Sequence, residues 1–147
     1  MGFDYNLDYK SLNFRDNPWD YKVGKGEQGV LLVEPYKSEL LPYWKFRTPK
    51  EAAVSARKIF LLFKKYKSDE DFIGMDMARK FLQMGFTRSR RYANHRSGKK
   101  YEGERLLPRD EDPEKAKSAK IFFKFWKRVE NDSRYRQMKS QWQEWFG

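Results

Sequence analysis

The stretch TPKEAAVSARKIFLLFKKY, residues 48–66, decides the fold class of this chain. Thr48 can cap a helix, Pro49 suits the first helical position, and Glu51 completes a capping box with Thr48. An apolar face follows at helical spacing and consists of Ala52, Ala56, Ile59, Phe60, Phe63 and Tyr66. A start signal followed by such a face predicts an amphipathic helix.

Signals for two more helices follow along the chain. Ser68 or Asp69 is expected to open the second helix, and Gly85 is placed to end it in a left-handed turn. Thr87 can then cap a short third helix over residues 88–95. This part of the chain therefore predicts two helices separated at the glycine.

Two further helices are predicted after a loop over residues 99–109. Asp112, which precedes a proline, is expected to begin the fourth helix, and Asp132 or Ser133 to cap the fifth. The fifth helix carries an apolar stripe that consists of Tyr135, Met138, Trp142 and Trp145. Core packing is the favoured role of this stripe, and a dimer seam is the alternative.

The first 47 residues are aromatic and irregular, so we expect an extended segment that packs its rings on the helices. Residues 30–33, VLLV, predict a buried strand, and residues 43–47 predict a second short one. The sequence thus predicts a mainly α fold: a compact bundle of about five helices, an aromatic and partly extended N-terminal segment, and room for a small β-hairpin. We expect a single domain over residues 1–147, helical over residues 48–147.

Composition limits the chemistry that this chain can perform. The net charge is +11, and residues 79–109 hold ten basic and two acidic residues, a concentration that is typical of proteins that bind a polyanion. No cysteine is present, which excludes disulfides, thiolate nucleophiles and cysteine-ligated zinc. His95 is the sole histidine, so a Ser-His-Asp triad elsewhere and a multi-histidine metal site are excluded as well.

No segment indicates export or membrane insertion. The opening residues MGFDYNLDYK are polar and acidic and lack the apolar region of a signal peptide. No apolar run approaches the roughly 20 residues that span a bilayer. We expect a cytoplasmic protein that uses no cofactor or metal, binds no membrane, and is a monomer or a weak homodimer.

The basic segment over residues 87–101 is the strongest functional signal. Its cations can neutralise phosphates, and they are Arg88, Arg90, Arg91, Arg96, Lys99 and Lys100. Its other candidate residues can stack on bases or form hydrogen bonds, and they are Tyr92, Asn94, His95 and Tyr101. The sequence predicts a non-catalytic protein that binds DNA or RNA through the phosphates, with little base specificity.

Three alternatives to nucleic-acid binding remain open. The basic segment can be no more than a solvated face of a helix, or it can dock an acidic protein partner. In the third alternative, an enzyme holds a phosphorylated small molecule between the basic segment and the glycine turn GKGEQG, residues 24–29. That turn matches a dinucleotide-binding pattern, but a strand instead of a helix is expected after it, so a tight structural turn is favoured.

Acidic clusters at residues 69–71 and 110–112 could bind Mg²⁺ for phosphodiester cleavage. Both clusters stand at predicted helix starts, where carboxylates stabilise the helix dipole. Helix capping is therefore the favoured interpretation of both.

Two long stretches, GKGEQGVLLVEPYKSELLPYWKF and GMDMARKFLQMGFTRSRRYANHRSGKKY, resemble the domain-of-unknown-function family 4385. The resemblance extends over most of the chain, and the family occurs in bacteria and in some phages of cyanobacteria. It implies a compact cytoplasmic domain and no particular reaction. A phage origin would make nucleic-acid binding or host takeover a reasonable role by analogy.

Overall fold

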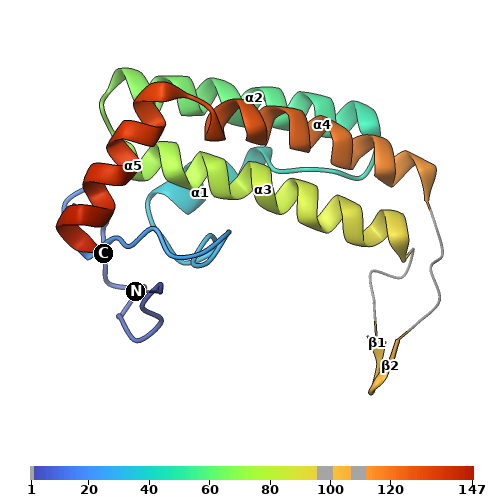
Figure 1. Cartoon of the computed structure of the whole chain (residues 1–147), viewed down its shortest axis with the longest axis horizontal. Coiled ribbons are helices and arrows are strands. Elements are labelled where there is room, and N and C mark those ends of the chain that lie inside the picture. Colours follow the sequence, from blue (N-terminus) through green and yellow to red (C-terminus); the bar gives the residue numbers. More distant parts are fainter. Residues whose placement is uncertain (1, 96–100, 107–111) are drawn as a thin grey trace.

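The computed structural model describes residues 2–95, 101–106 and 112–147 (Figure 1). The α-helices of this part are α1 (Tyr36–Leu40), α2 (Pro49–Ser68), α3 (Phe72–Asn94), α4 (Pro113–Glu130) and α5 (Ser133–Phe146). Two short 3₁₀ helices cover Pro18–Asp20 and Leu41–Tyr43, and strands β1 (Tyr101–Glu102) and β2 (Arg105–Leu106) form an antiparallel pair. The prediction of a mainly α fold with about five helices and a small hairpin is confirmed.

Three long helices form the body of the molecule. α2, α3 and α4 each pack against the other two, and the contact between α3 and α4 is the most extensive. α5 crosses the bundle at the end where α3 begins, and the N-terminal segment lies along α3 on the side away from α2 and α4 (Figure 1). The same segment also reaches the C-terminal half of α3: Thr87 donates to the carboxylate of Glu27 at 3.1 Å, and the ring centroids of Phe46 and Tyr92 are 6.1 Å apart.

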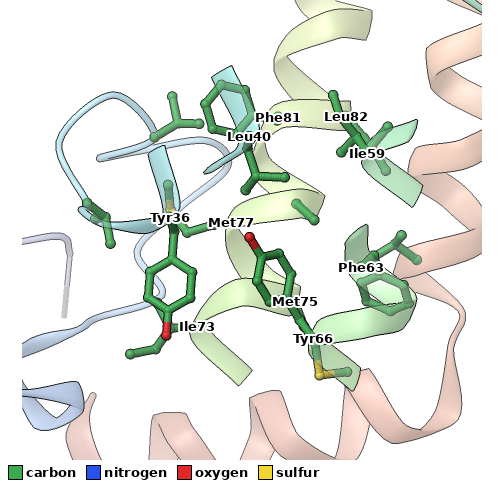
Figure 2. Close-up of a cluster of buried hydrophobic side chains, with 14 of the residues drawn as sticks. Tyr36, Leu40, Ile59, Phe63, Tyr66, Ile73, Met75, Met77, Phe81 and Leu82 are labelled. Atoms are coloured by element: carbon green, nitrogen blue, oxygen red, sulfur yellow. The ribbon is translucent and has the colours of Figure 1, made fainter. Parts of the chain in front are cut away.

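The core lies on both sides of the N-terminal half of α3. Figure 2 shows side chains from α1 and α2 packed around it, and the labelled members are Tyr36, Leu40, Ile59, Phe63, Tyr66, Ile73, Met75, Met77, Phe81 and Leu82. A helix that is covered on opposite sides needs apolar residues around most of its circumference. Accordingly, every residue from Phe72 to Leu82 is buried.

Side-chain caps fix the helix starts. The side chains of Thr48, Asp112 and Asp132 accept hydrogen bonds from backbone N–H groups of α2, α4 and α5, as their positions in the sequence predict. The second predicted helix begins later than expected, because Asp71 caps α3 through the N–H of Gly74 at 3.1 Å. The prediction that Ser68 or Asp69 opens this helix is therefore wrong.

Gly85 does not end a helix, and Thr87 does not cap one. α3 runs without interruption from Phe72 to Asn94, so the predicted second and third helices are one. The glycine serves close packing between helices: a Cβ at position 85 would lie 2.3 Å from the ring of Phe122 on α4. Thr87 instead directs its hydroxyl to the carbonyl of Met84 within the same helix, at 3.2 Å.

The predicted strand over residues 30–33 is absent, and consecutive turns take its place. Val30 N–H bonds to the carbonyl of Glu27, and Leu32 N–H bonds to the carbonyl of Gly29, which has φ 77°. The side chains of Val30 and Val33 are buried as expected, although the backbone of this run forms turns and not a strand. An apolar run of this length indicates burial more reliably than it indicates a strand.

Residues 43–47 also form no strand. Pro42 lies in a 3₁₀ helix, and the chain then passes extended along the bundle, where Lys45 N–H donates to the hydroxyl of Ser55 at 2.9 Å. This segment thus pairs with a side chain of α2 and not with another strand. The only ladder within the described ranges lies at residues 101–106, inside the predicted loop.

The apolar stripe of α5 packs against the core, as predicted, at Tyr135, Met138 and Trp142. Trp142 also donates its indole N–H to the carbonyl of Tyr21 at 2.9 Å, which ties the last helix to the N-terminal segment. Trp145, the final member of the stripe, is 64% exposed. None of the helices in the described part of the chain is long and apolar enough to cross a membrane.

Candidate nucleic-acid interface

Residues 87–95, here called the α3 end, form the last turns of α3 and its C-cap and hold most of the described part of the predicted basic segment. Arg88 and Arg91 are exposed, and neither forms an ion pair with an acid that the structure describes. Arg90 is half-buried and donates to the side-chain oxygen of Asn94 at 3.2 Å. The α3 end therefore presents the guanidinium groups of Arg88 and Arg91 to solvent. The guanidinium of Arg90 holds the side chain of Asn94 in place.

The non-cationic candidates at the α3 end are more enclosed than the arginines. Tyr92 and Asn94 are half-buried, and His95 is the C-cap residue of α3 with 7% of its surface exposed. A side chain with so little exposed surface has little area for a ligand. Among these candidates, Tyr92 and Asn94 have enough exposed surface to contact a nucleic-acid strand.

Several predicted site residues lie outside the described ranges. Arg96, Lys99 and Lys100 are in this group. Tyr101 is described, and it lies on β1 with 55% of its surface exposed. Its cross-strand partner is Leu106, and all six residues of the hairpin are exposed.

A cavity that the sequence did not indicate opens beside Tyr92. This Phe46–Tyr92 cavity has a volume of about 640 Å³ and is lined by Lys45, Phe46, Arg47, Glu51, Tyr92 and Lys115. The two rings have centroids 6.1 Å apart and planes inclined by 39°. Three chain segments far apart in sequence thus meet here, and for that reason no local motif could reveal the cavity.

Lys115 of α4 joins the walls of the Phe46–Tyr92 cavity. Its ammonium donates to the carbonyls of Phe46 and Arg47 at 2.9 and 2.8 Å, and it lies 5.2 Å from the ring centroid of Phe46. Partial burial lowers the pKa of Lys115, and Arg47 lowers it further, while Asp112 and Glu51 oppose both effects. Lys115 therefore fixes the extended segment of Phe46 against α4.

The glycine turn lies near the α3 end but lacks the geometry of a phosphate cradle, which the enzyme alternative requires. A cavity of about 400 Å³ joins Lys25 and Gly29 to Arg88, and it includes neither Gly26 nor Arg91. The carbonyls of Gly26 and Gln28 point inward to cations of α3. A phosphate cradle needs free N–H groups directed at the ligand, so the structural interpretation of this turn fits its geometry.

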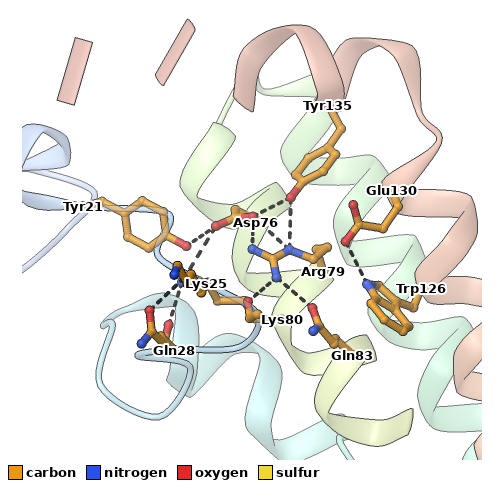
Figure 3. Close-up of polar contacts among 11 residues, drawn as sticks. Tyr21, Lys25, Gln28, Asp76, Arg79, Lys80, Gln83, Trp126, Glu130 and Tyr135 are labelled. Atoms are coloured by element: carbon orange, nitrogen blue, oxygen red, sulfur yellow. Dashed lines mark hydrogen bonds and ion pairs between the residues drawn. The ribbon is translucent and has the colours of Figure 1, made fainter. Parts of the chain in front are cut away.

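Arg79 and Lys80, which add to the sequence-level excess of charge, are not on the surface. They are 3% and 0% exposed and belong to a buried polar cluster with Asp76, Tyr21 and Tyr135 (Figure 3). Arg79 donates to Asp76 at 2.7 Å, and Tyr135 donates to the same carboxylate at 2.6 Å. The charge of residues 79–109 that can reach a ligand is therefore smaller than the sequence suggests.

Burial and mutual charge set the protonation of this cluster. Burial alone would raise the pKa of Asp76, but Arg79, Lys80 and the two tyrosine hydroxyls hold that pKa below its usual value. Burial lowers the pKa of Lys80 to about 7, and Arg79 adds to the decrease while Asp76 opposes it. Burial and the charge of Asp76 raise the pKa of both tyrosines well above the usual value.

Carboxylates near the helix ends act as caps. Asp71 and Asp112 accept hydrogen bonds from the first turns of α3 and α4, while Asp110 and Glu111 lie outside the described residues. Within the described ranges, no group of three potential ligands could hold a metal ion. Capping is thus confirmed for Asp71 and Asp112, whereas Asp69 stands at the end of α2 and Glu70 forms an ion pair with Arg134 at 3.2 Å.

The three long helices carry more positive charge than the net charge of consecutive sequence segments indicates. α2, α3 and α4 together contain 17 lysines and arginines but only 4 acidic residues. Exposed cations on the outer faces of α2 and α4 include Arg57, Lys64, Lys120, Lys124 and Arg128. The bundle therefore exposes further cations outside the α3 end.

The fold and this surface define a small, basic, mainly helical protein. The chain belongs to the family described as Domain of unknown function (DUF4385), which matches residues 4–145. The resemblance seen in the sequence is thereby confirmed at the level of the family. No curated protein and no solved structure matches the chain.

Proposed function

We propose that this protein binds nucleic acid, DNA or RNA, by neutralising phosphates at the α3 end. The observation that carries the proposal is the pair of exposed guanidinium groups of Arg88 and Arg91, which meet no acid in the described structure. A guanidinium can bind a phosphate through two parallel hydrogen bonds.

The surroundings of the α3 end support a polyanionic ligand over a small anion. α2 and α4 carry further exposed lysines and arginines. A long surface of one charge sign attracts a ligand with many regularly spaced charges, and each phosphate contact releases counterions from the nucleic acid. Binding through phosphates carries little base specificity.

The test is a fluorescence-anisotropy titration of labelled duplex DNA, single-stranded DNA and RNA over a salt series. Wild type is compared with Arg88→Ala/Arg91→Ala, and the matched control is Lys10→Ala/Arg136→Ala, which removes the same charge from exposed sites elsewhere. We expect the first variant to bind more weakly on all sequences and to lower the salt slope by about 2, since each lost phosphate contact lowers it by about 1.

The control variant should retain most of the wild-type affinity and slope. Equal losses in both variants would show only a response to net charge, and absence of binding at low salt would refute the proposal. In that last case, capture of an acidic protein partner by the same arginines becomes the next hypothesis to examine.

A further inference from the structure

The walls of the Phe46–Tyr92 cavity have the chemistry of a base-stacking site. The Phe46 and Tyr92 rings are inclined by 39° at 6.1 Å, so neither ring covers the other face to face. The Tyr92 hydroxyl forms no hydrogen bond with any residue in the described ranges, although the residue is half-buried. An aromatic face beside a free hydroxyl suits a flat, polar-edged ligand such as a nucleobase.

The charges around the cavity indicate that its ligand is anionic. Lys45, Arg47 and Lys115 line it, and Glu51 is the one acid among the lining residues. Lys45 and Arg47 are exposed, whereas two of the three ammonium donors of Lys115 are already bonded to backbone carbonyls. Lys45 and Arg47 can therefore meet the phosphates on either side of a bound base.

The position of the cavity connects it to the α3 end. Tyr92 follows Arg91 directly and lies one helical turn beyond Arg88, and residues four apart on a helix are neighbours on its surface. A nucleic-acid backbone that binds Arg88 and Arg91 would therefore run close to Tyr92, which lines the cavity. The cavity volume of about 640 Å³ falls within the range of small-molecule sites.

We propose that the Phe46–Tyr92 cavity receives an unpaired nucleobase, so that the protein prefers single-stranded to duplex nucleic acid. The inference rests on the proposed function, because the phosphates of the same strand must be held at the α3 end. A base within a duplex is stacked on both faces and can reach Tyr92 only after extrusion from the helix. An unpaired base reaches it directly.

The experiment compares two labelled single strands of equal length and charge, one intact and one with abasic sites in its central positions. Both keep every phosphate, so their difference in affinity reports contacts to bases alone. Wild type should bind the intact strand at least roughly fivefold more tightly than the abasic strand, given the usual worth of base–aromatic stacking. Tyr92→Leu should lose this preference and bind the abasic strand as wild type does.

Two controls separate stacking from folding and from general aromatic contact. Tyr92→Phe keeps the ring and should keep most of the preference, and Trp145→Leu removes an exposed ring from α5 and should change nothing. If Tyr92→Leu fails to fold by circular dichroism, a strand with 2-aminopurine serves with wild type alone. Its fluorescence should be quenched on binding when the analogue stacks on protein rings.

The outcomes distinguish this inference from the proposed function. Equal affinity of wild type for intact and abasic strands, or an unchanged preference in folded Tyr92→Leu, overturns the inference and leaves phosphate binding standing. An unquenched 2-aminopurine in a bound strand overturns it as well. Absence of binding to every strand overturns both proposals.

Discussion

Lys80 occupies an environment that its residue type does not predict. Its ammonium is fully buried, donates to the carbonyl of Gln28 at 2.7 Å, and lies 3.9 Å from the carboxylate of Asp76. Arg79, its neighbour in sequence, already binds that carboxylate at 2.7 Å. Two cations thus share one acid in the interior, and both hold the glycine turn through its carbonyls.

This arrangement predicts an unusual pH dependence of stability. The pKa of Lys80 is about 7 in the folded protein, whereas an unfolded lysine has a pKa of about 10.4. Between these values the unfolded state binds more protons, so the free energy of unfolding should rise with pH by up to about 1.4 kcal/mol per unit. Urea titrations of wild type between pH 7 and 9.5 should show this rise.

Lys80→Met should eliminate most of the pH slope, because it removes the lysine whose pKa is lowered to about 7 in the folded state. The lowered pKa of Lys115 leaves a smaller slope in the same direction. Lys64→Met is the matched control, since Lys64 is exposed on α2, and it should retain the wild-type slope. Parallel profiles for wild type and Lys80→Met would contradict the assignment. The window ends below pH 10, where Tyr21 and Tyr135 ionise in the unfolded state first and stability falls again.

At the scale of elements, contact between helices decides where glycine is needed. Gly85 lies inside α3, where glycine costs about 1 kcal/mol relative to alanine. The ring of Phe122 approaches to 2.3 Å of where a Cβ would stand. Close approach of α3 and α4 thus outweighs local helix preference at this position.

Gly85→Ala should therefore destabilise the protein by about 1–3 kcal/mol, in spite of the higher helix propensity of alanine. Thermal and urea unfolding would measure the change. The double variant Gly85→Ala/Phe122→Leu should be less destabilised than the sum of its single variants, because the smaller side chain relieves the overlap. A gain of stability in Gly85→Ala would contradict the packing argument.

The starts of α2, α4 and α5 were predictable because caps are local signals, whereas the start of α3 was placed too early. The other errors arose where distant contacts decide the structure. Thr48, Asp112 and Asp132 cap helices as the sequence indicates. The burial of Val30 and Val33 was also predictable, although Leu31 is 46% exposed, and the backbone form of this run depends on the absence of a pairing strand. Gly85 carries a local signal for a helix end, and the signal for its true role is a ring 37 positions later in the chain.

For the candidate site, Arg88 and Arg91 are exposed, and their role in phosphate binding stays a prediction. The Phe46–Tyr92 cavity was missed because its walls come from the segment before α2, from α3 and from α4. The burial of Arg79 and Lys80 was missed because basic residues are rarely found in an interior.

At the scale of the whole molecule, opposite charges are separated between helix bodies and helix ends. The bodies of α2, α3 and α4 hold 17 basic and 4 acidic residues, while Asp71, Asp112 and Asp132 stand at helix starts as caps. Capping places acids where they stabilise the helix dipole. The same arrangement leaves basic residues in excess along the sides of the three helices. A net charge summed over consecutive segments includes the capping acids, so it underestimates this excess.

The interior also depends on both ends of the chain. Tyr21 from the N-terminal segment and Tyr135 from α5 both donate to Asp76 of α3. The indole of Trp142 adds a direct hydrogen bond between these two flanking parts. The buried polar cluster is therefore complete only when segments from the beginning, middle and end of the chain are all in place.

We expect the folded protein to stay intact when its chain is cut in the hairpin between α3 and α4. Its residues 101–106 are all exposed, whereas α3 and α4 share the most extensive contact in the bundle. Brief digestion with a glutamate-specific protease should cut native protein after Glu102 or Glu104 first. The two fragments should elute together in gel filtration and separate only in denaturant, so the protein can be expressed as two complementing halves that reassemble without a connecting loop.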